Sequence, residues 1–361
     1  MAAGNVKKFM KEMSVLYYKN RLQIQKDTLD ACEGADLIIG GSLMTMPSCL
    51  ISEKLQVRVV FAFVNPVTVM TNQFPHFIVS HKPYPFKFLN KLSYQAFYTA
   101  YEKSAKIEIG EWRANLNLTA SNSSLFRRIR ELSVPVLHGY SPNLLSRPRD
   151  WPAHIAVGGC WKLPEKYKKT IAIPEDFISW LNDGEEPVYF GFGSMPVLYP
   201  DKMVDMVKHV CNKLRLRAVI NAGWSKIEKT SLGETIYLVH HTDLEYLFPK
   251  CKIVVHHGGV GTTHISLEAG VPTVVCSIFA DNPLWGERIK RLGVGKHIKY
   301  KELSQDKVVN ALNELENSSY KARAGELAKK IKSEKGLENA LSFIEKFQSC
   351  APVYSCAAAS R

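Results

Sequence analysis

A glycine-rich segment near residue 258 has the residue types and spacing to bind phosphate groups. Residues 253–263 read IVVHHGGVGTT, an apolar run that leads into glycines and then two threonines. This order is typical of a β-strand that passes through a tight turn into an α-helix. Glycine lets the backbone approach a ligand, and the first N–H groups of a helix are unpaired donors at the positive end of its dipole. The segment therefore has the chemistry to bind a diphosphate.

Side chains in this turn can supplement the backbone donors. Thr262 and Thr263 can donate hydrogen bonds through their hydroxyl groups, and His257 can donate to a phosphate oxygen as negative charge develops on it. His256, the residue before it in the predicted strand, is a further candidate. A glycine-rich turn alone is equally compatible with a purely structural role, so the surrounding elements must decide. The backbone candidates in the turn are Gly259 and Gly261.

A second strand and a second helix are predicted directly after the first pair. Gly270 is suited to end the first helix, residues 273–277 form an apolar strand, and residues 279–285 read FADNPLW. Because the carboxyl ends of parallel strands meet at one edge of a sheet, we expect Asp281 and Asn282 to lie near the glycine-rich turn. A carboxylate beside an amide can bind sugar hydroxyl groups.

Strands and helices alternate along both halves of the chain, which predicts an α/β protein with two parallel sheets. Residues 160–174 are rich in Lys, Glu and Pro, and we place the linker there. The sequence thus predicts one domain over residues 1–165, a second over 166–348 and a disordered tail over 349–361. A final helix over residues 321–347 is expected to cross back towards the first domain. The strands are predicted at 35–41, 57–64, 134–137, 188–192, 217–221, 236–240, 253–257 and 273–277. The other helices are predicted at 6–29, 201–214, 262–269 and 285–292, with one more between the first two strands that ends at residue 55.

Composition and charge limit the class of protein. The chain has 361 residues, of which 46% are apolar and 22% charged, as in folded globular proteins. Its 47 Lys and Arg against 34 Asp and Glu give a net charge of +13, which favours an anionic partner such as a membrane surface or a nucleotide. The basic residues lie in short clusters without a zinc-finger or RNA-recognition motif, which argues against nucleic acid.

The cysteines and the hydropathy pattern bear on the compartment. The 8 cysteines are dispersed without a CxxC pair, so we expect reduced thiols and a cytoplasmic setting. The first residues lack the apolar core of a signal peptide, and no apolar run approaches the roughly 18 residues of a membrane span. Any contact with a membrane is therefore expected to be peripheral.

Several motifs, in order along the chain, resemble one family. HHGGVGTT, EAGVPTVV and FADNPLWGERIKRLGVG closely resemble the donor-binding signature of UDP-dependent glycosyltransferases with the GT-B fold of two Rossmann-like domains. VYFGFGSMPV, AGWS and LEYLFPKCKIVVHHGG resemble more specifically the sterol 3-beta-glucosyltransferase branch. In the first half ADLIIGGS, FPHFIV, EWR, YSPNLL and RDWPAHIAVGG agree with it. The resemblance covers roughly residues 30–315.

The resemblance implies inverting transfer of a hexose from a UDP-sugar to the hydroxyl group of a sterol or similar lipid, with no metal or other cofactor. It places the diphosphate at His257, Gly261, Thr262 and Thr263, with Ser194 facing it, and the hexose at Asp281 and Asn282. It places the uracil near Trp224 and residues 239–241, including Val239 and His240; for Trp224 a buried core position is the alternative. UDP-hexose, the lipid acceptor and an anionic membrane surface are the expected partners.

The aromatic, Pro-rich segment of residues 68–113 is the expected acceptor site, or else a plain hydrophobic core. Its candidates for acceptor binding are Phe74, His76, Phe77 and Phe97.

The sequence departs from the family pattern at two places. Asn282 stands where the family usually has Gln. Because of this departure the resemblance favours glucose only weakly, and the hexose stays open. The family's first strand and GxRGD-like turn, which carry the general base, have no counterpart, so we expect an incomplete N-terminal domain and no assigned base. His76 and His81 are the candidates for a substitute. The alternative is a non-catalytic or partner-dependent UDP-sugar-binding chain, whose first domain a partner chain would complete; another lipid or a polyprenyl acceptor is also open.

Overall fold

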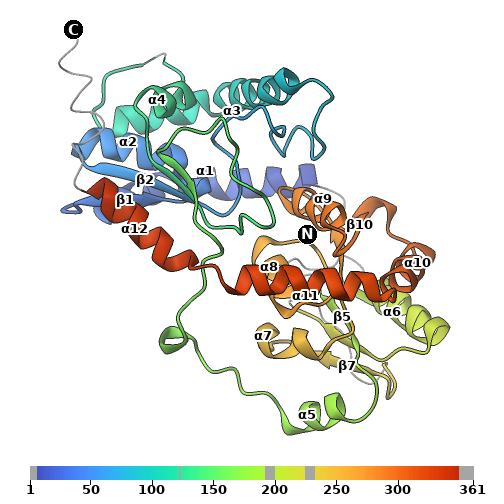
Figure 1. The fold of residues 1–361 in the computed structure, drawn as a ribbon. Helices are drawn as coiled ribbons and strands as arrows, with labels where there is room; N and C mark the ends of the chain where they lie inside the picture. Colours follow the sequence, from blue (N-terminus) through green and yellow to red (C-terminus); the bar gives the residue numbers. More distant parts are fainter. Residues whose placement is uncertain (1–5, 122, 192–199, 224–231, 349–361) are drawn as a thin grey trace. The chain divides into compact units, whose positions relative to one another are not determined.

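The computed structural model describes residues 6–121, 123–191, 200–223 and 232–348 (Figure 1). The chain divides into two compact units. The N-terminal unit contains Met13–Lys162 and Lys335–Arg361, and the C-terminal unit contains Leu163–Glu334 and Met1–Glu12. The change from one unit to the other after Lys162 lies close to the predicted boundary at residue 165.

The described strands of the N-terminal unit form one parallel sheet in chain order, β1-β2-β3-β4. The strands are β1 (Leu37–Gly40), β2 (Arg58–Phe63), β3 (Val136–His138) and β4 (Ile155–Val157). The helices are α1 (Val6–Asp30), which begins in the other unit, α2 (Thr45–Leu55), α3 (Lys87–Asn115), α4 (Leu125–Glu131) and α12 (Gly336–Gln348). The predicted strand-helix-strand unit at residues 35–64 is thus present as β1, α2 and β2.

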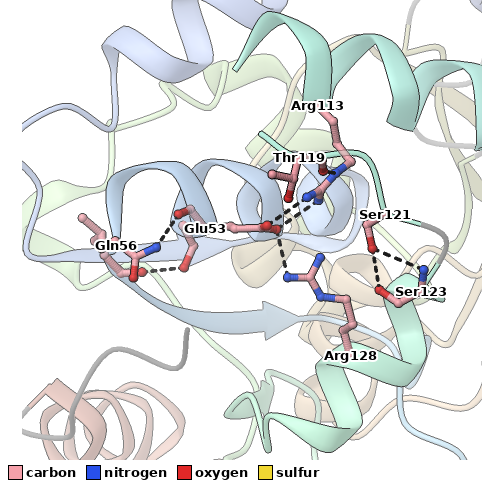
Figure 2. Close-up of polar contacts among 9 residues, drawn as sticks. Glu53, Gln56, Arg113, Thr119, Ser121, Ser123 and Arg128 are labelled. Carbon is pink, nitrogen blue, oxygen red and sulfur yellow. Dashed lines mark hydrogen bonds and ion pairs between the residues drawn. The ribbon is translucent and has the colours of Figure 1, made fainter. Parts of the chain in front are cut away.

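Residues 111–113, the EWR motif, attach α3 to its neighbours in this unit. Glu111 forms an ion pair with Arg21 of α1 at 3.0 Å, and Trp112 is buried. Arg113 forms a two-pronged ion pair with Glu53 of α2, at 2.9 and 3.1 Å (Figure 2). The motif therefore positions a long helix whose own apolar pattern is weak.

The C-terminal unit contains a parallel sheet with the strand order β10-β9-β8-β5-β6-β7. Numbered within the unit this is 6-5-4-1-2-3, the order of doubly wound dinucleotide-binding folds, and it reverses between β5 and β8. The strands are β5 (Val188–Gly191), β6 (Ala218–Asn221), β7 (Ile236–Val239), β8 (Ile253–His256), β9 (Thr273–Ser277) and β10 (Gly295–Lys299). The helices are α5 (Glu175–Asn182), α6 (Pro200–Leu214), α7 (Leu244–Leu247), α8 (Val260–Ala269), α9 (Asn282–Leu292), α10 (Gln305–Leu315) and α11 (Ser318–Lys332).

Both faces of this sheet are buried, as the continuous apolar strands require. Val188 and Phe190 of β5 pack on one face against a cluster that includes residues of α6 and α10. Tyr189, between them, packs on the other face against a cluster that includes residues of α5 and α7. The alternation of side chains along each strand therefore produces two separate cores.

The predicted helix over residues 321–347 is two helices, α11 and α12, separated by residues 333–335. α11 belongs to the C-terminal unit and α12 to the N-terminal unit, whereas the predicted second domain included all residues up to 348. Asn339 of α12 donates to the Gly158 carbonyl at 2.8 Å. A Cβ atom at Gly336 would lie 2.0 Å from the Cys160 carbonyl oxygen, so glycine permits this close approach. None of the helices within the described ranges has the length and apolarity needed to cross a bilayer.

Candidate functional site

The turn between β8 and α8 keeps an open space in front of a helix N-terminus. Gly258 has a φ of +90°, and a Cβ atom there would lie 2.6 Å from Cγ1 of Val275, so only glycine fits. Gly259 is the N-cap residue of α8 with an extended backbone. Gly261, in the first turn, is exposed, and a Cβ atom there would meet nothing within 4 Å. The first N–H groups of α8 therefore have no intrahelical partner and face accessible space.

Three buried polar atoms around this turn have no hydrogen-bond partner among the residues that the structure describes: Nε2 of His256, Nδ1 of His257 and Oγ1 of Thr263. Such atoms are rare and costly in folded proteins. Their partners must come from outside the described residues. An anionic ligand with several oxygen atoms would accept hydrogen bonds from those of the three groups that carry a proton.

His256 is held as a neutral ring. Its Nδ1 accepts a hydrogen bond from the backbone N–H of Gly258 at 3.0 Å, so the ring proton lies on Nε2, the atom without a partner. Burial lowers the pKa of His256 to about 3, and the neighbouring His257 contributes to the shift. His256 thus braces the glycine turn and presents one N–H donor.

His257 and Asp281 influence each other electrostatically. Burial lowers the pKa of His257 below its ordinary value, and the negative charge of Asp281 opposes this shift. Oδ2 of Asp281 accepts a hydrogen bond from the buried indole Nε1 of Trp285 at 2.8 Å, which fixes the carboxylate at the start of α9. Asn282 is buried, and its carbonyl oxygen lies 3.1 Å from the place that a Cβ atom of Gly258 would occupy. The structure therefore brings the segment at 281–282 to the glycine turn.

Other predicted donor-site residues lie elsewhere or outside the description. The side chain of Val239 is buried in a hydrophobic core with residues of α5 and α7, so only its backbone could face a base. His240 is exposed directly after β7. Thr262 is half-buried in the first turn of α8. Ser194 and Trp224 lie outside the described residues, as does the tail from 349 to 361.

The aromatic segment predicted to bind the acceptor packs largely into its own core. Phe74 and Phe77 are buried, and His76 stacks on Phe97 with ring centroids 3.7 Å apart. Nε2 of His76 donates to the Val67 carbonyl at 3.0 Å, and Nδ1 accepts from the Ile78 N–H at 3.2 Å.

Burial lowers the pKa of His76 to about 4. Both ring nitrogens of this neutral histidine are hydrogen-bonded, so neither is available to take a proton from the hydroxyl group of the acceptor substrate. The ring of the other candidate, His81, has its Nδ1 3.3 Å from the Phe77 carbonyl oxygen.

Two polar features of the N-terminal unit were missed by the sequence analysis. Glu53 also accepts a hydrogen bond from Arg128 of α4 at 2.9 Å, so one carboxylate joins three helices (Figure 2). His138 is fully buried at the end of β3 and stacks on Trp151 with a centroid distance of 4.7 Å. Neither Glu53 nor His138 belongs to a spaced group of polar residues in the sequence, so only the fold reveals their partners. Among the described residues, no group of three or more His, Cys, Asp or Glu side chains is placed to hold a metal ion.

Comparison with known proteins agrees with this architecture. Residues 216–339 match the family described as Erythromycin biosynthesis protein CIII-like, C-terminal domain. A solved structure of the glycosyltransferase of kitacinnamycin superimposes with a TM-score of 0.69 at 15% identity, covering 96% of this chain and 85% of that one. The class is therefore clear: the chain has the GT-B fold of glycosyltransferases.

Within that class, the chain is a homologue of sterol 3-beta-glucosyltransferases. It is 38% identical over 210 residues to one from Arabidopsis thaliana, a match that covers 56% of this chain and 32% of the relative. It is 30% identical over 330 residues to one from Komagataella phaffii, covering 88% of this chain and 27% of the relative. The chain thus spans about a third of one relative's length and about a quarter of the other's.

Proposed function

We propose that this protein transfers a hexose, with inversion, from a UDP-hexose to the hydroxyl group of a sterol. The observation that carries the proposal is the group of unpartnered polar atoms at the β8–α8 turn, next to the carboxylate of Asp281. The names of the homologous proteins support the reaction, the sterol as acceptor and glucose as the hexose.

In the proposed reaction, the acceptor oxygen forms a bond to the anomeric carbon while the bond from that carbon to the UDP oxygen breaks. The leaving diphosphate gains negative charge, which the N-terminus of α8, Thr263 and His257 stabilise by donating hydrogen bonds. Asp281 accepts hydrogen bonds from hexose hydroxyl groups. The acceptor's proton passes to a general base other than His76, because both ring nitrogens of His76 are already hydrogen-bonded.

Binding of UDP tests the donor site separately from turnover. His257→Ala and Thr263→Val each remove one donor, so we expect the dissociation constant for UDP, measured by calorimetry, to rise at least tenfold. His209→Ala, an exposed histidine on α6, is the matched control and leaves the constant unchanged. Unaltered UDP affinity in both site variants would contradict this placement of the diphosphate.

Transfer itself is tested by mass spectrometry of lipid extracts. The protein is incubated with sterol-containing anionic vesicles and a mixture of UDP-hexoses, and a sterol-plus-hexose mass is the expected product. In the proposed reaction, protein groups alone stabilise the negative charge of the leaving diphosphate, so EDTA should leave the rate unchanged. A rate that falls with EDTA and returns with added Mn²⁺ would contradict that assignment.

We further propose that the protein acts at anionic membrane surfaces through the start of α3. Phe86 and Phe88 are 64% and 65% exposed and stack on each other, and Leu92 is exposed one turn later. Lys82, Lys87 and Lys91 lie among them, and residues 54–101 contain no Asp or Glu. Exposed aromatic side chains between lysines suit an interface of acyl chains and anionic head groups.

A second candidate function is UDP-sugar binding that requires a partner chain for transfer. In the described sheet β1 pairs only with β2, and Leu43, just after it, is 95% exposed. An edge strand with apolar neighbours favours pairing with another chain. This candidate predicts UDP binding without product by the chain alone, and product formation by the chain alone would exclude it.

A further inference from the structure

The N-terminal unit contains a cavity of about 300 Å³ that the proposed reaction does not use. It lies between α3, α4 and the beginnings of β3 and β4. Its walls are mainly apolar and include Val69, Tyr98, Phe126, Ile129, Val134 and Ile155. A volume near the lower end for ligand pockets, with apolar walls, suits a single alkyl chain.

The cavity lies at the amino ends of its strands. Val136 and Ile155 are the first residues of β3 and β4, and Val134 and His154 precede them. None of the described residues that follow β3 or β4 directly lines it. The cavity shares residues between Thr68 and Tyr98 with the predicted acceptor segment. However, ligands that react in open parallel sheets bind at the carboxyl ends of the strands, so this cavity lies at the opposite edge from the expected reaction.

One polar atom inside the cavity wall lacks a partner. Oγ1 of Thr68 is buried and makes no hydrogen bond with any described residue. The Tyr98 hydroxyl donates to the Thr68 carbonyl at 2.7 Å and so fixes this residue beside the cavity. Thr68 can therefore offer a hydrogen bond to an oxygen atom of a ligand.

Two cations with no ion pair to a described residue line the same cavity. Lys91 and Arg130 are exposed, and the Arg130 guanidinium lies 4.0 Å from the sulfur of Met70. Asp150 also lines the cavity, and its carboxylate accepts hydrogen bonds from the Thr71 hydroxyl at 2.6 Å and the Asn72 N–H at 2.7 Å, which orient it without removing its charge. Two cations against one carboxylate leave a net positive charge at the cavity.

We propose that this cavity binds an amphipathic anion, whose alkyl chain lies against the apolar walls and whose carboxylate or phosphate contacts Arg130 and Lys91. This goes beyond the proposed glycosyl transfer and does not depend on it. A membrane-derived fatty acid and a phosphorylated lipid share this chemistry.

The test is calorimetric titration of the full chain with dodecanoate, dodecyl phosphate and dodecanol, each below its critical micelle concentration. We expect one or both anions to bind, and whichever binds more tightly identifies the head group. Arg130→Gln and Lys91→Gln should each weaken binding about tenfold, and Val69→Trp, which fills the cavity, should abolish it. Lys103→Gln, an exposed lysine on the same helix, is the matched control and leaves affinity unchanged.

Thermal denaturation followed by circular dichroism, compared with the unaltered chain, shows that the N-terminal unit of each variant is folded, and UDP binding shows that its C-terminal unit is folded. The proposal is overturned if neither anion binds a chain that binds UDP, if Arg130→Gln and Lys103→Gln bind equally, or if dodecanol binds as tightly as dodecanoate. Displacement of dodecanoate by cholesterol would also overturn it, because the cavity would then be the acceptor site. Failure of UDP binding in the unaltered chain would instead count against the proposed donor site, so the two failures are distinguishable.

Discussion

At the residue scale, the negative charge of Glu53 contributes to the stability of the N-terminal unit. Burial alone would raise the pKa of Glu53, but Arg113 and Arg128 together hold it below its ordinary value of 4.5. A carboxyl group whose pKa is lowered by folding stabilises the protein above its unfolded pKa. That contribution is lost as the pH falls through the folded pKa.

We therefore expect Glu53→Gln to lower the free energy of unfolding at pH 7 by about 2 kcal/mol, since two arginines lose their partner. The difference between variant and unaltered chain should begin to shrink below pH 4.5 and disappear only when the pH falls below the lower pKa that Glu53 has in the folded protein, as followed by urea denaturation at several pH values. Glu131→Gln, which breaks the exposed pair with Arg127 at 2.7 Å, is the control and should change nothing measurable. An equal loss in both variants would contradict the role given to Glu53.

Asp281 is expected to recognise the hexose and not the nucleotide. Asp281→Asn should leave the affinity for UDP within about twofold of its original value. It should remove the extra affinity that UDP-glucose has over UDP, because the amide replaces one acceptor by a donor. Competition calorimetry measures this difference without turnover, and Asp205→Asn on the exposed face of α6 is the matched control. A change in UDP affinity of tenfold or more would contradict the assignment of Asp281 to the hexose.

At the scale of elements, two glycines at the start of α8 are expected to have different roles: Gly258 a structural one, and Gly261 one in ligand binding. Gly258→Ala forces a side chain into a φ of +90° and against Val275, so we expect a loss of about 3 kcal/mol in unfolding free energy. Gly261→Ala meets no neighbour and removes a flexible residue from a helix, so stability should rise by up to about 1 kcal/mol.

UDP binding distinguishes these two variants further. The methyl group of Gly261→Ala projects into the space in front of the helix, and it should weaken UDP binding although the protein is more stable. Denaturation and calorimetry on the same samples check both expectations. A Gly261→Ala protein with unchanged UDP affinity would show that the ligand does not approach this turn.

Sequence patterns predicted the elements of the C-terminal unit more fully than the details of its site. Each strand from β5 to β9 overlaps a predicted strand, because buried parallel strands are continuous apolar runs with clear ends. The same continuity hides which face a residue points to. The resemblance placed Val239 near the uracil; its side chain lies in the core, so this stays a prediction for its backbone.

The N-terminal unit was less predictable because its polar contacts join distant segments. The link between Glu53 and Arg113 spans 60 residues, and that between Asp150 and Thr71 spans 79. No local period reports such pairs. The burial of His76 was likewise not visible, since an aromatic segment that lines a ligand site and one that packs on itself have the same composition.

At the scale of the whole molecule, the exposed start of α3 predicts attachment to membranes. Replacing Phe86 and Phe88 by Ser should lower the fraction that co-sediments with vesicles of phosphatidylcholine and phosphatidylserine at least tenfold, because two aromatic side chains no longer insert. Added salt should weaken the binding that remains. Ile107→Ser, at a residue that is 71% exposed further along the same helix, is the control. If the co-sedimenting fraction falls equally in the two variants, membrane binding does not depend specifically on Phe86 and Phe88.

The sequence analysis placed one domain boundary at residue 165 and the end of the second domain at residue 348, whereas the chain leaves the N-terminal unit after Lys162 and returns to it at Lys335. A change in composition marks the linker, whereas residues 333–335 are polar like the helices on either side. The second break depends on where α12 packs, which a linear pattern does not contain.

That return of the chain has a consequence for recombination between relatives. Because α12 packs with the N-terminal unit, the segment from Leu163 to Glu334 is inserted between Lys162 and Lys335 of that unit and is not a detachable C-terminal half. A chimera that exchanges everything after Lys162 would import a foreign α12, and with it new contacts at Gly158 and Cys160. Exchange of Leu163–Glu334 alone keeps the native α12 and its contacts at Gly158 and Cys160, so such a chimera tests whether the proposed donor site by itself sets the sugar specificity.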